Sequence, residues 1–330
     1  NGMATIEEFI EEWNSTCPWI EAHTSGSTGT PKSIRLLKSD MRISAQATNR
    51  FFGINRNSVL GLPLSVDYIA GKMMVVRALE AGCRLEAFPV SADLNLASCR
   101  ERIDLLSLVP AQLPAVLSQS SLSDRVRCML IGGAGISDET AASVLASGVD
   151  AYIGYGMTET CSHVALSSIS ACGGRVYHAM PDVTFDTDSR GCLTVIAPRF
   201  SFRSLQTNDM VELLTPTSFR WCGRYDNVIN SGGIKFFAEE LEKLYALPVG
   251  KHAYYVCSEI DRLWGQRIVL VVECDAGAIS GIKRGIEAVV TDHKRRPKTY
   301  IAVRAISRTA TSGKIKREMP ADDNIVSRIC

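Results

Sequence analysis

Residues that could bind a ligand are most concentrated near the start of the chain, in a hydroxyl-rich stretch at positions 24–32. Glycines there let the backbone approach a ligand closely, and hydroxyls, successive backbone N–H groups and a lysine suit a polyphosphate. A solvated Ser/Gly linker is the alternative, but the stretch ends in Pro-Lys and continues directly into the apolar segment 34–37. We therefore predict a phosphate-binding loop made of Thr24, Ser25, Gly26, Ser27, Thr28, Gly29 and Lys32.

Two common phosphate motifs are excluded. A P-loop needs glycine directly before its Lys-Ser/Thr pair, and here that position is Pro31, which has no N–H and a fixed φ. A dinucleotide fingerprint needs G-x-G-x-x-G, and the G-Y-G stretch at 154–156 has Glu159 at the third glycine position. The sequence thus argues against both a GTPase-like and a dehydrogenase-like protein.

A second cluster, G-Y-G-M-T-E-T, occupies 154–160. Tyr155 could stack on a base, Thr158 could bond a phosphate, and Glu159 could hold Mg²⁺. The alternative is a strand-to-helix turn in which Thr158 is the cap.

Three further clusters follow. The segment 205–209 ends in Asp209, which could accept hydrogen bonds from ribose hydroxyls, although Asn-Asp is usually a simple turn. G-R-Y-D at 223–226 precedes a Gly-Gly pair at 232–233, and T-S-G-K-I-K-R lies at 311–317. For the last run, a solvated basic tail is the alternative.

Composition limits the class of protein. The 330 residues suggest two or more domains, and 46% hydrophobic with 22% charged residues is ordinary for a globular protein with real cores. A net charge of +1 gives no argument for nucleic acid or a membrane surface, and we expect neither a membrane span nor a signal peptide. The eleven cysteines lack C-x-x-C spacing and the five histidines lack ligand spacing, which favours a cytoplasmic protein without structural zinc.

Helices and strands alternate over 33–155, which predicts an α/β fold with a doubly wound, mostly parallel sheet. Ligands of such sheets bind at the carboxyl ends of the strands, where the glycine-rich turns at 132–135 and 154–156 would lie. A small β-rich subdomain is expected over 163–230, followed by a small α+β domain. The expected helices cover 5–13, 38–52, 69–80, 110–118, a segment after Ser137, 238–246 and 280–291; the expected strands cover 34–37, 58–62, 83–88, 105–109, 127–131, 149–153, 191–196, 210–214, 219–222, 253–258, 267–273 and 299–306.

The order and spacing of the five clusters resemble the adenylate-forming superfamily of acyl-CoA synthetases, luciferases and peptide-synthetase adenylation domains, over about residues 22–318. The resemblance implies that the first loop binds the triphosphate. It implies further ATP- and AMP-binding residues, namely Gly133, Ala134, Gly154, Tyr155, Gly156, Met157, Thr158, Asp209 and Arg224. It also implies catalytic roles for Lys314, Thr158 and Glu159, with Glu159 as the Mg²⁺ ligand, Asp226 as the hinge, and Gly232 and Gly233 along the coenzyme A path.

By this resemblance, a large AMP-binding domain covers 1–225 and a small mobile domain covers 226–330. A carboxylate would attack ATP to give an acyl-adenylate and pyrophosphate, and the acyl group would then pass to coenzyme A with release of AMP. A carboxylate is already ionised at neutral pH, so the first step needs no general base. It needs positioning and charge stabilisation, which lysines, Mg²⁺ and backbone N–H groups supply.

The segments 68–74 and 156–163 resemble the o-succinylbenzoate–CoA ligase branch of menaquinone biosynthesis, whose substrate has an aromatic ring and two carboxylates. Ligases of this branch place a carboxylate-binding arginine where Arg77 lies here. Lys72 is the other candidate cation and His163 a pocket-lining residue, whereas a solvated helix charge is the alternative for Arg77. The chain departs from the superfamily in beginning almost at the phosphate loop, and in its segment 63–71, which lacks the usual histidine or aromatic.

Three alternatives remain open from the sequence. The first is another aryl- or fatty acyl-CoA ligase, and the second is an adenylation domain that loads a carrier protein. The third is a degenerate, non-catalytic nucleotide-binding protein. It is disfavoured because a member that has lost its activity usually lacks at least one key residue, and here all five are present: Lys32, Glu159, Asp209, Arg224 and Lys314. The expected partners are small molecules, and the oligomeric state is left open, a homodimer included.

Overall fold

The computed structural model describes residues 5–23, 33–170, 175–308 and 315–330. The predicted phosphate loop, Thr24 to Lys32, and Lys314 lie outside these ranges. The N-terminal part begins with helix α1 (Ile6–Asn14), which Thr5 caps in a capping box with Glu8. Strands β1 (Trp19–His23) and β2 (Ser33–Leu37) then form an antiparallel pair on either side of the loop.

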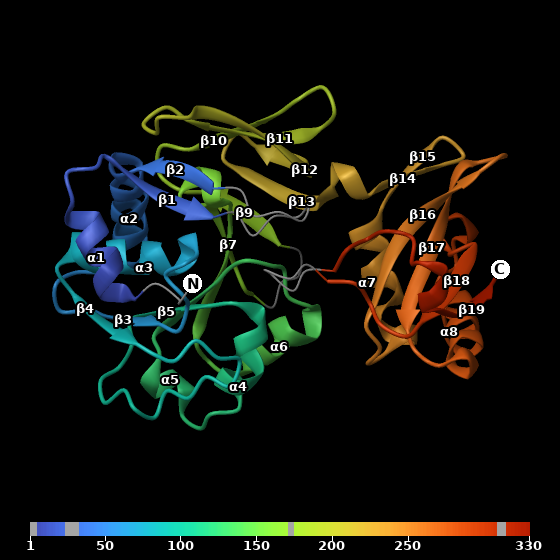
Figure 1. Ribbon diagram of the computed structural model, residues 1–330, viewed down its shortest axis with the longest axis horizontal. Helices are drawn as coiled ribbons and strands as arrows, with labels where there is room; N and C mark the ends of the chain where they lie inside the picture. The colour runs from blue at the N-terminus through green and yellow to red at the C-terminus, as the bar shows by residue number, and fades with distance from the viewer. Residues whose placement is uncertain (1–4, 24–32, 171–174, 309–314) are drawn as a thin grey trace.

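An eleven-stranded sheet dominates the chain up to residue 224 (Figure 1). Its order is β10-β11-β12-β13-β9-β8-β7-β6-β5-β3-β4. The pairs between β4 and β7 are parallel and all later ones antiparallel. The strands are β3 (Val59–Leu62), β4 (Arg84–Ala87), β5 (Leu105–Leu108), β6 (Cys128–Ile131), β7 (Asp150–Gly156), β8 (His163–Ser168), β9 (Val176–Ala179), β10 (Thr184–Thr187), β11 (Cys192–Ala197), β12 (Arg203–Thr215) and β13 (Ser218–Arg224).

The parallel half is doubly wound, as predicted. The chain moves from β3 outward to β4 in one direction, and from β5 through β6 to β7 in the other. Right-handed crossovers therefore place helices on opposite faces, with α2 and α3 on one side and α4, α5 and α6 on the other (Figure 1). β5 and β6 are buried along their whole length, as strands covered on both faces should be. The helices are α2 (Lys38–Phe52), α3 (Ile69–Ala81), α4 (Leu113–Leu117), α5 (Leu122–Arg125) and α6 (Asp138–Ala146).

The predicted β-rich subdomain continues the same sheet, because β8 pairs with β7 and β9 with β8. Helix α3 is followed by Gly82, whose φ of 62° is the left-handed conformation that glycine favours at a helix C-terminus. Several described elements differ from expectation. The unexpected ones include β8, β9, β10, α5 and, later in the chain, the strands at 228–231, 234–237 and 325–329. The segment 19–23 forms β1, and the segment expected as a strand over 210–214 extends back to Arg203.

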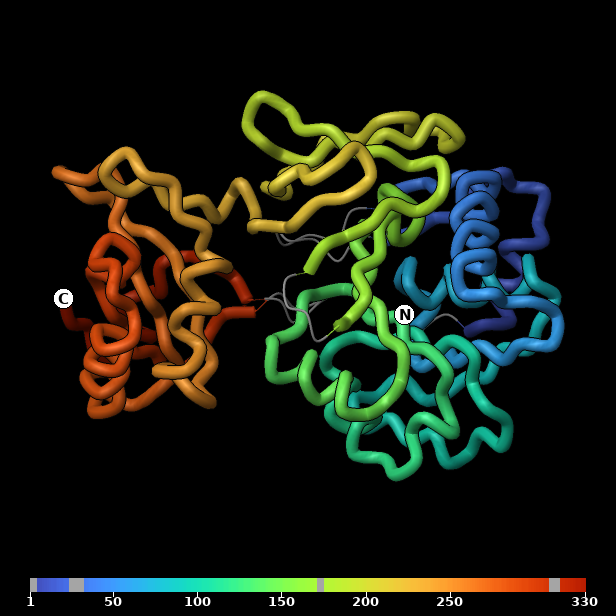
Figure 2. The backbone as a smooth tube through the Cα atoms, turned by 180° about the vertical axis from the view of Figure 1, so that it is seen from behind, coloured from blue at the N-terminus to red at the C-terminus, as the bar shows by residue number. Residues whose placement is uncertain are grey.

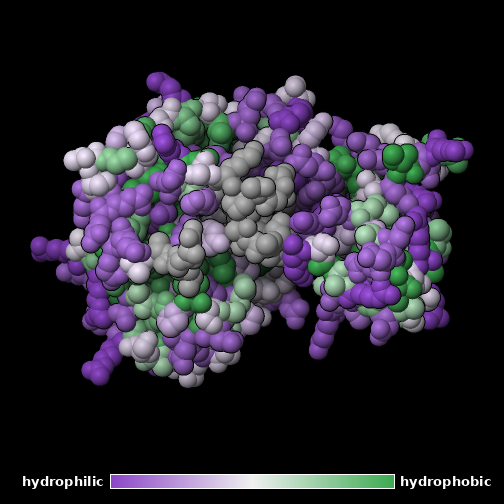
Figure 3. Space-filling model, in the orientation of Figure 1, coloured by the Kyte–Doolittle hydropathy of each residue, from purple (hydrophilic) through white to green (hydrophobic). Residues whose placement is uncertain are grey.

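From residue 228 onward the chain forms a second, six-stranded sheet with its own buried clusters (Figure 2). Its strand order is β15-β14-β17-β18-β19, with β16 also paired to β17. The elements are β14 (Val228–Ser231), β15 (Ile234–Phe237), α7 (Ala238–Val249), β16 (Tyr254–Asp261), β17 (Gly265–Glu273), α8 (Ala276–Val289), β18 (Thr299–Val303) and β19 (Ile325–Ile329). In the space-filling view, hydrophilic residues cover most of this face of the protein (Figure 3). Among the described residues, no helix is long and apolar enough to cross a membrane.

Candidate active site

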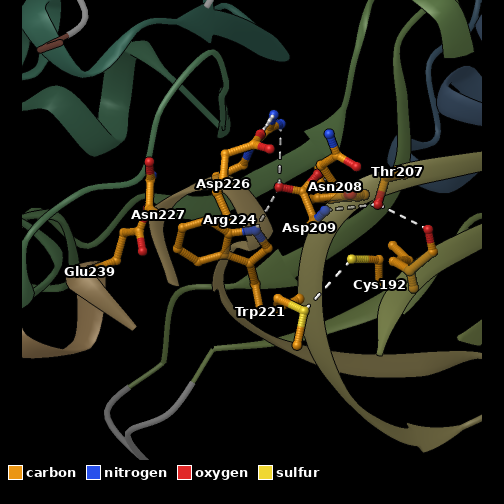
Figure 4. Close-up of polar contacts among 12 residues, drawn as sticks. Cys192, Thr207, Asn208, Asp209, Trp221, Arg224, Asp226, Asn227 and Glu239 are labelled. Atoms are coloured by element: carbon orange, nitrogen blue, oxygen red, sulfur yellow. Dashed lines mark hydrogen bonds and ion pairs between the residues drawn. The ribbon is translucent and has the colours of Figure 1, made fainter. Parts of the chain in front are cut away.

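Asp209 is the centre of a polar cluster at the end of the large sheet (Figure 4). Its carboxylate is 7% exposed and accepts a 2.7 Å hydrogen bond from the Tyr155 hydroxyl and a 3.1 Å bond from Trp221 Nε1. The Thr207 hydroxyl accepts a hydrogen bond from the Asp209 backbone N–H, at 3.0 Å. Burial and the neighbouring Asp209 carboxylate raise the pKa of Tyr155 well above its usual value. The aspartate is therefore fixed as an acceptor, which suits paired ribose hydroxyls.

Arg224 lies beside this carboxylate because it is paired with Asp209 in the register of β12 and β13. One guanidinium nitrogen is 3.8 Å from Asp209 and another donates a 2.9 Å bond to Asp226. Arg190 approaches from the other side, where it donates to the Asn208 side chain and to the Thr207 carbonyl and lies over the Tyr225 ring. The structure thus brings together the predicted ribose contacts Asp209 and Arg224 and the predicted hinge residue, Asp226.

The glycine-rich segment 132–135 follows β6, as predicted, whereas the turn predicted at 154–156 is the last part of β7 and pairs with β8. Because β6 and β7 are neighbouring parallel strands, both segments lie at the same edge of the sheet. Gly133 adopts φ 83°, which favours glycine. A Cβ at Gly156 would lie 2.2 Å from the Ser162 carbonyl oxygen, so only glycine fits there. Gly154 is less restricted, with the His163 Cβ 3.2 Å from its virtual Cβ.

Thr158 and Glu159 follow in a short 3₁₀ turn, residues 158–160. Thr158 is not the cap of the alternative interpretation, because it is the first residue of the turn and Met157 occupies the cap position. The Thr160 hydroxyl accepts a hydrogen bond from the Met157 N–H, at 2.9 Å. Glu159 is exposed. Mg²⁺ is commonly bound by one or two carboxylates together with substrate phosphates and water, so a single exposed Glu159 beside the edge where phosphates are predicted to bind fits this ion. Within the described ranges, no three His, Cys, Asp or Glu side chains form a self-contained metal site.

Arg77, Ser162, His163 and Thr48 form a second, more deeply buried cluster. Arg77 is 1% exposed and donates a 2.6 Å hydrogen bond to Ser162 Oγ. Ser162 Oγ lies 3.3 Å from His163 Nδ1, and His163 Nε2 lies 3.2 Å from the Thr48 hydroxyl. No acidic side chain among the described residues forms an ion pair with Arg77, and its Nε has no hydrogen-bond partner.

The electrostatics of this cluster follow from burial. Loss of solvent lowers the pKa of the Arg77 guanidinium to about 9. Burial and the charge of Arg77 hold the pKa of His163 well below its usual value, so the imidazole is neutral. The alternative that Arg77 is a solvated helix charge is therefore wrong. Lys72 faces elsewhere, with its ammonium 3.8 Å from a Glu12 carboxylate oxygen and 4.5 Å from the Phe9 ring centre.

Gly232 and Gly233 form the two-residue turn between β14 and β15, with φ 58° and 78°. Positive φ at both positions is what a tight type I′ hairpin requires. The Trp264 ring packs on this turn, because a Cβ at Gly232 would lie 2.6 Å from it. The Gly-Gly pair is therefore the turn of a defined hairpin.

Four residues of these clusters were not predicted from the sequence: Thr48, Ser162, Arg190 and Trp221. Trp221 could have been found, because it lies two residues before the G-R-Y-D motif that contains Arg224. Thr48 and Arg190 lie far from any motif.

Comparison with known proteins defines the class. The family described as "AMP-binding enzyme" matches residues 18–190, and the chain belongs to this family. A solved acyl-CoA synthetase (AMP-forming)/AMP-acid ligase II-like protein from Dyadobacter fermentans is 32% identical, with a TM-score of 0.62, over 94% of this chain and 91% of that one. The predicted superfamily, fold class and AMP-forming ligase class are thereby confirmed.

Particular relatives are 2-succinylbenzoate–CoA ligases. That of Haemophilus influenzae is 28% identical over 97% of this chain and 74% of its own length. That of Enterococcus faecalis is 25% identical over 89% and 67%. The fold also matches o-succinylbenzoate-CoA synthetase of Bacillus subtilis in complex with its acyl-adenylate intermediate, with a TM-score of 0.78, 20% identity, and coverage of 90% of this chain and 67% of that one. The predicted resemblance to this branch is confirmed.

Proposed function

We propose that this protein is an ATP-dependent acid–CoA ligase that activates o-succinylbenzoate. The observation that supports this choice of substrate is the burial of Arg77, whose guanidinium has no acidic partner among the described residues. A buried charge is costly unless it is paired, so this arginine calls for an anion that the chain does not supply there. One carboxylate of a dicarboxylic acid would react, and the other would pair with Arg77. A fatty acid would leave the guanidinium unpaired.

In the first half-reaction, the ionised carboxylate attacks the α-phosphorus of ATP and pyrophosphate leaves. Asp209 and Arg224 hold the ribose, and the backbone at the 132–134 and 154–157 turns supports the adenine and the α-phosphate. Thr24 to Lys32 hold the β- and γ-phosphates, and Lys314 contacts the reacting carboxylate and phosphate. When bound at Glu159, Mg²⁺ would offset the charge of the phosphates. Thr158 is left free to bond the α-phosphate.

In the second half-reaction, coenzyme A thiolate attacks the acyl-adenylate and AMP leaves. We propose that the chain divides into domains 1–225 and 226–330, and that the small domain turns about Asp226 to bring the Gly232–Gly233 hairpin to the thioester site. The cysteines that the structure describes are all free, which supports our proposal of a reducing, cytoplasmic location. A homodimer is a further proposal, which sedimentation of the purified protein would test.

The test is a coupled assay of AMP release with ATP, Mg²⁺ and coenzyme A. The acids compared are o-succinylbenzoate, an aromatic monocarboxylate and a long-chain fatty acid. We expect AMP and thioester formation with the dicarboxylate, and at least a tenfold lower kcat/KM with the other two, which lack the carboxylate for Arg77. Absence of AMP with o-succinylbenzoate would refute the substrate proposal, and turnover of the fatty acid alone would favour the alternative ligase class.

A further inference from the structure

Two consecutive residues of α2 are linked to Arg77 by hydrogen bonds, Asn49 directly and Thr48 through two other side chains. Asn49 Nδ2 donates a 2.9 Å hydrogen bond to the Arg77 carbonyl oxygen and so contacts the helix backbone at that residue. Thr48 contacts the guanidinium indirectly, through His163 and Ser162. Both α2 residues are buried, Thr48 at 0% and Asn49 at 7% exposure. Neither has a role in the proposed reaction as described above.

The Thr48 end sets the direction of the hydrogen bonds in this chain. The Thr48 hydroxyl is 2.9 Å from the Ser44 carbonyl oxygen, which can only accept, so the hydroxyl proton points there. His163 Nε2 then carries a proton and donates it to Thr48, and Nδ1 of the neutral imidazole is an acceptor. The Ser162 end is compatible with this direction, because Ser162 Oγ accepts from Arg77 and still has its own proton to donate to His163 Nδ1. The arrangement therefore favours the neutral tautomer of His163 with its proton on Nε2.

We propose that Thr48 is a positioning residue for the distal-carboxylate site: through His163 and Ser162 it fixes the orientation of the Arg77 guanidinium and leaves Arg77 Nε free for the substrate. This inference rests on the proposed function, because it gives Arg77 the second carboxylate of the acid as its ligand. It adds that the neutral imidazole contributes orientation but no positive charge. Arg77 is then the only cation among the described residues of this cluster. Its Nε is buried and has no hydrogen-bond acceptor there, and we propose that the substrate carboxylate accepts the hydrogen bond from it.

The proposal predicts a specific pattern among variants of Thr48. Thr48→Val keeps the shape but removes the acceptor for His163, and we expect KM for o-succinylbenzoate to rise roughly 3- to 10-fold, the usual effect of one lost internal hydrogen bond. KM for ATP should stay within about twofold, because Thr48 does not contact the Asp209 cluster. Thr48→Ser keeps the hydroxyl and should restore the wild-type KM. As a matched control, Gln46→Ala removes another α2–α3 hydrogen bond, that to Glu80, and should change neither constant.

A second readout does not depend on the substrate. In the full chain without ligand, ¹⁵N NMR distinguishes which imidazole nitrogen carries the proton, and comparison with His163→Gln assigns the signal. We expect the Nε2–H tautomer, and loss of this fixed form in Thr48→Val but not in Thr48→Ser. An Nδ1–H tautomer, or equal KM values for wild type and Thr48→Val, would overturn the proposal. If no acid gives AMP, the proposed function fails, and the tautomer measurement still decides whether the hydrogen-bond chain exists.

Discussion

The hydroxyl of Tyr155 donates a 2.7 Å hydrogen bond to Asp209 Oδ2, although their strands are not neighbours in the sheet. Three strands, β8, β9 and β13, lie between β7 and β12. In a flat sheet, four spacings of about 4.8 Å would separate the two strands by roughly 19 Å. The sheet must therefore curl back on itself, and the rings of Tyr177 and Phe219 pack against Tyr155 inside the curve. The proposed ribose site is a product of this curvature.

Removal of that hydroxyl should weaken nucleotide binding. In Tyr155→Phe, a buried carboxylate oxygen loses its donor, and hydrogen bonds to charged groups contribute about 1.5–3 kcal/mol. We expect KM for ATP to rise about tenfold or more in the pyrophosphate-release assay, with KM for the acid little changed. Tyr177→Phe is the matched control, because no hydrogen bond from its hydroxyl is found in the described parts of the chain. Equal effects of the two variants would contradict the role given to Tyr155.

Substitution of Arg77 should affect binding and stability in opposite directions. Arg77→Met removes a buried charge that has no acidic partner within the described ranges, and replacement of buried ionic groups by apolar ones is often neutral or stabilising by about 1–4 kcal/mol. The same change removes the ligand of the distal carboxylate, so KM for o-succinylbenzoate should rise about 10- to 150-fold. Urea unfolding and AMP release measure the two effects.

The control for this prediction is Lys72→Met, which removes the other candidate cation. Because Lys72 lies beside Glu12 and Phe9, we expect a small loss of stability and an unchanged KM for the acid. A larger rise of KM in Lys72→Met than in Arg77→Met would reverse the assignment of the two residues.

The sequence was sufficient for the parallel half of the fold and for the edge of the sheet where the site lies, because apolar strands followed by glycine turns have a direct physical meaning. It could not place Arg77. The residues of α3 from 71 to 78 are all buried. The alternation of apolar and polar residues that usually tells the buried face of a helix from its exposed face is therefore missing, and the sequence could not show that Arg77 is buried. The strand at 19–23 was missed although Ile20 and Ala22 alternate with exposed neighbours, a signal that was present.

Contacts made by the curved sheet could not be predicted either. Tyr155 and Asp209 are 54 residues apart, and their hydrogen bond depends on the curl of strands whose order the sequence does not state. The contacts of Arg77 were hidden for another reason: Thr48 comes from α2, Ser162 from the residue before β8 and Arg77 from α3, and only the packing of these elements joins them.

His163 should make stability depend on pH. Its pKa lies near 6.5 in the unfolded chain and well below that value in the folded protein, because of burial and the Arg77 charge. Below about pH 6.5 the unfolded chain binds a proton that the folded protein does not, so the free energy of unfolding falls as the pH is lowered through this window. His163→Gln should flatten this slope by about one proton in urea titrations between pH 5 and 7. The exposed His178 gives the control, and His178→Gln should keep the wild-type slope.

Gly156→Ala should damage both substrate sites at once. The added Cβ would lie 2.2 Å from the Ser162 carbonyl oxygen, so the backbone must shift at the end of β7, where we propose that the nucleotide binds, and at Ser162, the partner of Arg77. We expect a loss of about 1–3 kcal/mol of unfolding free energy, as for other overpacked sites, and higher KM values for both ATP and the acid. Gly281→Ala is the control, since Gly281 lies in α8 outside the proposed sites and a Cβ there meets no described atom within 4 Å. Selective loss of ATP binding alone would show that the shift does not reach Ser162.

Lys314 should matter for adenylation and not for thioester formation. A lysine that contacts the reacting carboxylate and phosphate stabilises charge only while those two anions approach each other, and the loss of one such group costs on the order of 10²-fold or more. In Lys314→Ala, ATP–pyrophosphate exchange with o-succinylbenzoate should therefore fall by that factor. Transfer of the acyl group from prepared acyl-adenylate to coenzyme A should proceed at the wild-type rate, because the phosphate is by then a leaving group and, in the proposed reaction, the small domain turns about Asp226 before this step. Lys316→Ala, two residues away in the same basic run, should leave both half-reactions unchanged. Equal losses in the two half-reactions would mean that this lysine supports the fold or both half-reactions. The proposed role of Lys314 in adenylation alone would then be wrong.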